Sequence, residues 1–177
     1  MPGRKKWLTI LILALLCASC GEDGTYTISF DANGGSGNLP HAVKAPAGEY
    51  VVLPGAPGLS TNNYRFIGWN TERVNSGSEG GRFNVGAYLP PPSQDMTMYA
   101  DWIEAATSLY TVTFNSNGGE SRRSQEVADG RTANEPPAPT RGGYTFGGWY
   151  SDSALTAPYS FSTPVTGNIT LHAGWIG

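Results

Sequence analysis

Alternation of apolar and polar residues marks the strands of this chain. In the segment Tyr110–Phe114 the large apolar side chains fall on one face and the threonines on the other. A period of two, with β-branched and aromatic residues enriched, is typical of a half-buried β-strand. Asn117-Gly118-Gly119 follows directly and supplies residues that tolerate positive φ, so a tight turn is expected there.

The same strand and turn occur twice. Residues 26–35 (YTISFDANGG) reappear as residues 110–119 (YTVTFNSNGG). Two further landmarks follow in the same order in both halves, residues 64–70 with 144–150 and residues 96–102 with 169–175. Three ordered matches at similar spacing indicate two copies of one structural unit.

Each copy is expected to be a mainly β domain, with a small sheet of about four antiparallel or mixed strands. If it contains any helix, the fold class would be α+β. In the second copy we expect a strand over 124–133 that bends at Asp129-Gly130, a proline-rich surface loop at 136–140, and at most a short helical turn within 151–163. Aromatic burial is expected to stabilise so small a unit. The expected core residues are Ile28, Phe30, Phe66, Trp69, Phe83, Met98 and Trp102 in the first copy, and Val112, Phe114, Phe146, Trp149, Phe161, Leu171 and Trp175 in the second.

The N-terminus has the layout of a secretory signal peptide. The basic residues Arg4-Lys5-Lys6 precede an apolar run, Trp7–Leu16, which we expect to be helical and which is far shorter than the about 20 residues of a membrane span. The small residues before Cys20 resemble the lipobox of bacterial lipoproteins, which implies that Cys20 is acylated and becomes the new N-terminus. Cys17 stands where that motif usually has Leu, Val or Ile. An ordinary signal peptide with two incidental cysteines is the alternative.

These landmarks divide the chain into five segments. They are a lipoprotein signal peptide at 1–19, a tether at 20–25, the first copy at 26–102, a linker at 103–109 and the second copy at 110–177. A linker of this length keeps the copies close together, although its residues do not dictate the angle between them.

Cysteine usage and charge narrow the possible functions. Both cysteines lie in the export segment, so beyond Cys20 the chain has no disulfide, no thiolate metal site and no cysteine nucleophile. Export removes three basic residues and no acidic ones, which moves the formal charge from −3 to −6. An acidic exported chain argues against nucleic acid as a partner.

The repeated landmarks together resemble the Listeria–Bacteroides repeat, also called the internalin B-repeat. The second copy carries its motifs almost throughout, in Pro139-Thr140-Arg141, in residues 143–150 and in residues 163–171. The first copy has residues 57–63 in place of Pro-Thr-Arg, and a longer Gly/Ser insertion at 75–82. The resemblance implies two tandem β-grasp-like domains on an exported or surface protein, with roles in adhesion and protein contact and none in catalysis.

The residues themselves do not assemble a recognisable active site. His172 is expected to be a partly exposed sheet residue and His41 a loop residue, and neither a Gly-x-Ser-x-Gly elbow nor a His-Glu-x-x-His motif is present. We therefore expect no enzyme, no metal and no cofactor. A carboxylate pair hidden by the fold is the enzymatic alternative.

Two classes of function remain. The first is a binding module at the cell surface, held to the membrane through its lipid anchor, whose partner is a protein or a glycan. Its candidate binding residues are the loop arginines Arg82, Arg122 and Arg123. The second is a spacer or periplasmic envelope scaffold without a specific ligand. Both place the chain in the bacterial cell envelope, and the outer membrane or the cell surface is the expected location.

Overall fold

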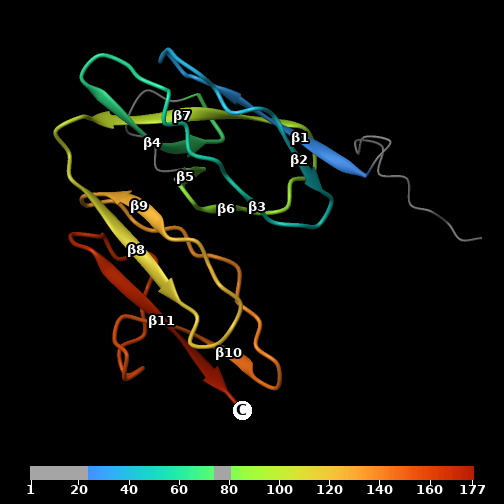
Figure 1. The fold of residues 1–177 in the computed structure, drawn as a ribbon, viewed down its shortest axis with the longest axis vertical. Coiled ribbons are helices and arrows are strands. Elements are labelled where there is room, and N and C mark those ends of the chain that lie inside the picture. The colour runs from blue at the N-terminus through green and yellow to red at the C-terminus, as the bar shows by residue number, and fades with distance from the viewer. Residues whose placement is uncertain (1–23, 74–80) are drawn as a thin grey trace, which may run out of the picture.

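The computed structural model describes residues 24–73 and 81–177, and this part of the chain is built from β-strands and loops (Figure 1). The first copy contains β1 (Thr25–Asp31), β2 (Val43–Pro46), β3 (Val51–Val52), β4 (Tyr64–Asn70), β5 (Arg82–Asn84), β6 (Tyr88–Leu89) and β7 (Met96–Glu104). The second contains β8 (Leu109–Asn115), β9 (Gln125–Ala128), β10 (Thr145–Tyr150) and β11 (Ile169–Ile176). Over the described ranges no helix is long and apolar enough to cross a bilayer. The expected signal helix, Cys20 and most of the tether lie outside these ranges.

Each copy forms its own mixed sheet, as the sequence predicted. The first sheet has five strands in the order β2-β1-β7-β4-β5, and the second has four in the order β10-β11-β8-β9. In both, the first and last strands of the copy pair in parallel, β1 with β7 and β8 with β11, while the other neighbours are antiparallel. The first copy adds a separate two-stranded sheet of β3 and β6. The prediction of two small tandem β domains is confirmed.

The Asn-Gly-Gly turn has the same construction in both copies. In the second, Asn117 and Gly118 adopt φ values of 44° and 85°, and the Gly119 N–H donates to the Ser116 carbonyl at 2.9 Å. The ring of Trp175 lies against this turn, where a Cβ on Gly119 would stand 2.4 Å from a ring carbon. Glycine is therefore required at this position, since the closing tryptophan packs closely on the turn and its Nε1 also donates to Ser116 O at 3.0 Å.

The residues predicted from the sequence belong to the two cores, and the first core also contains Val51, Leu53, Leu59 and Leu89, which were not predicted. Ile28, Trp69, Met98 and Trp102 are buried in the first copy, as are Val112, Phe114, Trp149 and Leu171 in the second. The remaining expected core aromatics pack against these clusters as partly buried side chains. Aromatic contacts connect the strands in both copies. The Trp149 ring centroid, for example, lies 5.0 Å from that of Phe114 and 5.5 Å from that of Phe146, edge to face.

The expected strand over 124–133 is only partly correct. β9 ends at Ala128, and the chain turns at Asp129-Gly130, with φ of 76° at Gly130. The backbone N–H groups of Asp129 and Gly130 donate to Ser108 O and Val165 O, so the chain leaves the sheet to bind neighbouring loops. Residues 136–140 are an irregular loop and residues 151–163 contain turns but no helix, as predicted.

Candidate functional site

The three arginines predicted to bind a partner have different surroundings. Arg82 lies in β5 with its side chain 13% exposed, and Arg122 lies in the loop after β8 with its side chain 6% exposed. Arg123 is exposed. The structure does not bring the three together as one surface, and Cys20, the predicted lipidation site, lies outside the described residues. The role of the three arginines in binding remains a prediction.

Arg122 is held by the protein's own backbone. Its Nε donates to Pro137 O and its Nη2 to Ala138 O, both at 2.9 Å, and the guanidinium also pairs with Glu120. The hydrogen bond and charge of Arg122 lower the pKa of the Glu120 carboxyl from its usual range. Arg122 thus fixes the proline-rich loop to the segment that follows β8, which is a structural task.

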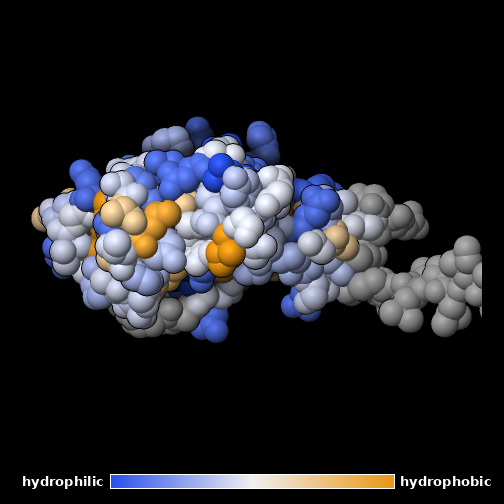
Figure 2. Space-filling model, turned by 90° about the horizontal axis from the view of Figure 1, so that it is seen from below, coloured by the Kyte–Doolittle hydropathy of each residue, from blue (hydrophilic) through white to orange (hydrophobic). Residues whose placement is uncertain are grey.

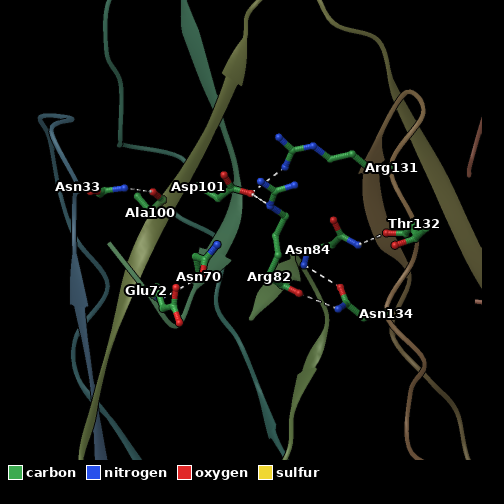
Figure 3. A network of polar contacts seen from close by, with 10 residues as sticks. All are labelled: Asn33, Asn70, Glu72, Arg82, Asn84, Ala100, Asp101, Arg131, Thr132 and Asn134. Carbon is green, nitrogen blue, oxygen red and sulfur yellow. Dashed lines mark hydrogen bonds and ion pairs between the residues drawn. The ribbon is translucent and has the colours of Figure 1, made fainter. Parts of the chain in front are cut away.

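Arg82 belongs to an ion-pair cluster that joins the two copies (Figure 3). Asp101 of β7 is buried, with 3% of its side chain exposed, and its Oδ2 lies 2.8 Å from Arg82 Nε and 2.8 Å from Arg131 Nη1. Arg82 comes from the first copy and Arg131 from the second. One carboxylate therefore receives a guanidinium from each repeat.

A cluster of amide side chains lies beside this ion pair and also crosses between the copies. The Asn84 N–H donates to Asn134 Oδ1 at 2.9 Å, and Asn134 Nδ2 returns a hydrogen bond to Arg82 O at 2.9 Å. Asn84 Nδ2 donates to Thr132 O at 3.1 Å. Gln125, which is fully buried, donates to Asn134 O at 2.7 Å and accepts from Asn134 N at 2.8 Å. These reciprocal hydrogen bonds satisfy the buried amides and fix the orientation of each.

Backbone contacts also join the two copies. Val85, just beyond β5, forms an antiparallel bridge with Glu126 of β9, so the first copy extends the free edge of the second sheet. At Gly86, which has φ of 85°, a Cβ would stand 2.3 Å from Ser124 O of the other copy. The close approach of the two backbones therefore requires glycine at this point.

The connection between the copies is also fixed. β7 continues through Glu104 and β8 begins at Leu109, which leaves a short turn between them. Arg65 of β4 donates through Nη2 to the carbonyls of Ala105 and Thr107, and the Ala105 N–H donates to Asn63 O at 2.9 Å. The turn is thereby bound to the first sheet. We use the term junction for these contacts together with the ion pair and the amide cluster.

A cavity of about 300 Å³ opens at the junction. Residues 81–84 line one side of it, and residues 130–132 with Asn134 line the other. Both guanidinium groups of the ion-pair cluster belong to its lining residues. The Nη2 atom of Arg82 is buried and has no hydrogen-bond partner in the structure. This polar cavity, to which each repeat contributes an arginine, is the candidate functional site.

Most of the residues that build the junction were missed by the sequence prediction. The strand registers show what signal was available. Gln125 pairs with Val112 where the first copy pairs Val43 with Ile28, and Asp101 occupies the register position of Gly174. Polar residues that stand in one copy at positions where the other has Val or Gly form the contact between the copies.

The other residues that could take part in catalysis or metal binding are explained by their own surroundings. His172 is half-buried in β11 with its Nδ1 3.4 Å from Asn115 Nδ2, and His41 lies in an exposed loop, as expected for both. Within residues 24–73 and 81–177 no three His, Cys, Asp or Glu side chains gather as a metal site. Hydrogen bonds from Thr156 and Ala157 lower the pKa of Asp152, and burial raises that of Tyr159.

One face of the molecule is mainly hydrophilic, with hydrophobic residues in small separate patches (Figure 2). Among the described residues, the large exposed apolar or aromatic side chains are Leu39, Tyr50, Tyr64, Tyr144, Leu155 and Ile176. Contacts made through the face in view depend mainly on polar groups.

Comparison with known proteins gives matches along most of the chain. The Listeria-Bacteroides repeat domain matches residues 26–101 and 110–174. A protein of Evansella cellulosilytica, named as a Gly-rich membrane protein, is 35% identical over 155 residues, which cover 85% of this chain and 17% of that protein. Internalin H of Listeria monocytogenes is 33% identical over 150 residues, which cover 84% of this chain and 24% of internalin H. The chain thus spans less than a quarter of the length of these relatives.

Proposed function

Because the chain belongs to the Listeria–Bacteroides repeat domain family, we propose that it is an envelope-anchored, non-catalytic interaction module that presents its two repeats as one rigid unit. Two of its relatives are named as membrane proteins of Evansella cellulosilytica and one as internalin H, which favours a cell-envelope location for this chain as well. The family consists of surface proteins and is not known to contain enzymes. Membership in it therefore favours a binding role over a catalytic one for this chain.

The junction is the observation that carries this proposal. A buried carboxylate shared by Arg82 and Arg131, an amide cluster and a backbone bridge together hold the repeats at one angle. A fixed angle sets the relative positions of the two repeats before any partner binds, and this reduces the entropy lost on binding. Such preorganisation favours an interaction module over a flexible connector.

The anchor in this proposal is a lipid on Cys20. The tether that follows it is short, so the first repeat lies close to the membrane surface and the second further out. A diacylglycerol with an additional acyl chain gives stable attachment, since a single chain binds membranes only marginally.

Metabolic labelling with an alkyne fatty acid tests the anchor. The wild-type chain incorporates the label, Cys20→Ala does not, and the matched control Cys17→Ala still does. Label retained in Cys20→Ala would contradict the assignment of this cysteine.

Protease treatment of intact cells tests surface exposure. The chain is expected to be degraded while a periplasmic protein survives, with lysed cells as the reference. Survival of the chain in intact cells would confine it to the periplasm and favour the scaffold alternative.

Attachment of cells tests the interaction itself. Cells with and without the chain are allowed to settle on surfaces coated with mucin, gelatin or purified peptidoglycan. An interaction module raises the attached fraction on at least one coating. Equal attachment of both strains on all three coatings would leave the spacer as the better account.

A further inference from the structure

We propose that the cavity at the junction binds a carboxylated sugar residue, with Arg131 as the direct contact and Arg82 beside it. This inference rests on the proposed function, since it names a ligand class for the same two-repeat unit. It starts from the charges that line the cavity.

The described charged groups at the cavity have an excess of positive charge. Arg82 and Arg131 both pair with Asp101, and within the described ranges no other carboxylate lies within 4 Å of either guanidinium. Two cations on one anion leave one formal positive charge in a largely buried cluster. Because an uncompensated charge is unfavourable in a partly desolvated site, an anion entering the cavity would be stabilised there.

The hydrogen-bonding groups of the lining also favour an acceptor. The amides of Asn84 and Asn134 are engaged with the opposite repeat. Arg82 Nη2 has no acceptor but is buried, so Arg82 contributes charge and not a direct contact. A guanidinium offers donors only, arranged as a planar fork that matches a carboxylate. Arg131 is the more exposed of the two arginines, with 18% of its side chain accessible compared with 13% for Arg82, so it receives the direct contact.

The size and polarity of the cavity favour a sugar as the carrier of that carboxylate. Its volume of about 300 Å³ is at the lower end of the range of small-ligand pockets, which fits a single ring. Among the lining residues that the structure describes, Phe83 is the only aromatic one, and the others are polar residues or glycines. A single excess charge suits a monovalent carboxylate better than a phosphate, which carries nearly two charges at neutral pH.

Calorimetric titration of the full-length protein in detergent tests this assignment, with glucuronate, glucose, acetate and inorganic phosphate as separate probes. Glucuronate is expected to bind in the millimolar range, acetate more weakly, and glucose not at all. The proposal of a carboxylated sugar would be overturned if glucuronate did not bind, if acetate bound as tightly as glucuronate, or if phosphate bound more tightly than glucuronate.

Variants locate the site. Arg131→Gln is expected to weaken glucuronate binding about tenfold or more, as removal of a charge-assisted contact does. Arg131→Lys keeps the charge beside Asp101 and the fold, but loses the fork, and is expected to bind more weakly than the wild type. Arg141→Gln removes the same charge from a residue that stacks on Tyr144, away from the cavity, and is expected to bind as the wild type does. Equal affinity of all three variants would overturn the assignment.

The two proposals fail separately. If glucuronate does not bind but cells that carry the chain still attach better than cells without it, the interaction module stands and the ligand assignment is wrong. If attachment is unchanged while glucuronate binds at Arg131, the cavity is a ligand site without a role in adhesion.

Discussion

Replacing Asp101 by asparagine removes the charge that the two repeats share while it preserves the shape of the side chain. Asp101 is 3% exposed at its side chain and contacts Arg82 and Arg131, each at 2.8 Å. The substitution leaves both guanidinium groups without their counter-ion, so the contact between the repeats weakens together with the contact within the first repeat.

The size of the effect follows from the burial of these groups. Hydrogen bonds to charged groups contribute about 1.5–3 kcal/mol each, and removal of one member of a buried ion pair costs about 3–5 kcal/mol. The two arginine side chains keep 13% and 18% of their surface in water, which offsets part of this loss. We therefore expect Asp101→Asn to lower the free energy of unfolding by about 3 kcal/mol, which corresponds to a fall in Tm of roughly 6–12 °C if both repeats unfold together.

Equilibrium denaturation followed by tryptophan fluorescence measures this change, and a double-mutant cycle isolates the part that crosses the junction. The cycle combines Asp101→Asn with Arg131→Gln, and a coupling energy of about 1–2 kcal/mol is expected. Asp129→Asn, at an exposed carboxylate, is the matched control and should change stability by less than about 0.5 kcal/mol. A coupling energy near zero would refute the reasoning, since the ion pair would then not join the repeats.

Three further predictions concern the second repeat. Gly119→Ala should lower the free energy of unfolding by about 1–3 kcal/mol, because its Cβ would stand 2.4 Å from the Trp175 ring. Gly142→Ala, where a Cβ meets nothing within 4 Å, is the control. Equal stability of the two variants in urea denaturation would contradict the packing argument. Arg122→Ala should cost about 2 kcal/mol or more and speed proteolysis of the proline-rich loop, since two backbone carbonyls lose a charged donor; a loop cleaved no faster than in the wild type would count against this role. The pKa of Glu120 is lowered in the folded state, so its contribution to stability is present above the usual glutamate pKa of about 4.3 and is lost as the pH falls through the folded-state value. Glu120→Gln should therefore flatten the acid side of the profile of stability against pH, measured by urea titrations. An unchanged profile would show that the Arg122 contact does not stabilise the fold.

Local patterns predicted the strands of the three repeated landmarks, the Asn-Gly-Gly turns and the aromatic residues of the cores, but not the shorter strands β2, β3, β5 and β6 of the first copy. The alternation in Tyr110–Phe114 and the Asn-Gly-Gly turn are specified by residues within a few positions of one another, so they can be read without knowledge of the rest of the fold. The strand over 124–133 was predicted too long because its end depends on hydrogen bonds from Asp129 and Gly130 to distant loops. A turn residue alone does not reveal whether the chain afterwards returns to the sheet.

The junction was not predictable from such patterns. Arg82 was predicted as an exposed loop residue, whereas its surroundings depend on Asp101 and on Arg131 of the other repeat. The residues of the linker do not dictate an angle between the copies, but Arg65 of the first sheet binds the linker carbonyls of Ala105 and Thr107. Contacts of this kind join residues about 20 to 50 positions apart, and a repeat pattern records what the copies share. The junction is built from residues in which they differ.

The proposed function requires the two repeats to form one rigid unit. The sequence has no thiol beyond Cys20, so the variant Tyr50→Cys/Ile176→Cys, made with Cys17 and Cys20 replaced by alanine, carries one exposed spin label in each repeat. Pulsed electron spin resonance between these labels should give a single narrow distance distribution that broadens in Asp101→Asn. A broad distribution in the chain that retains Asp101 would contradict the claim and would show that the repeats move independently.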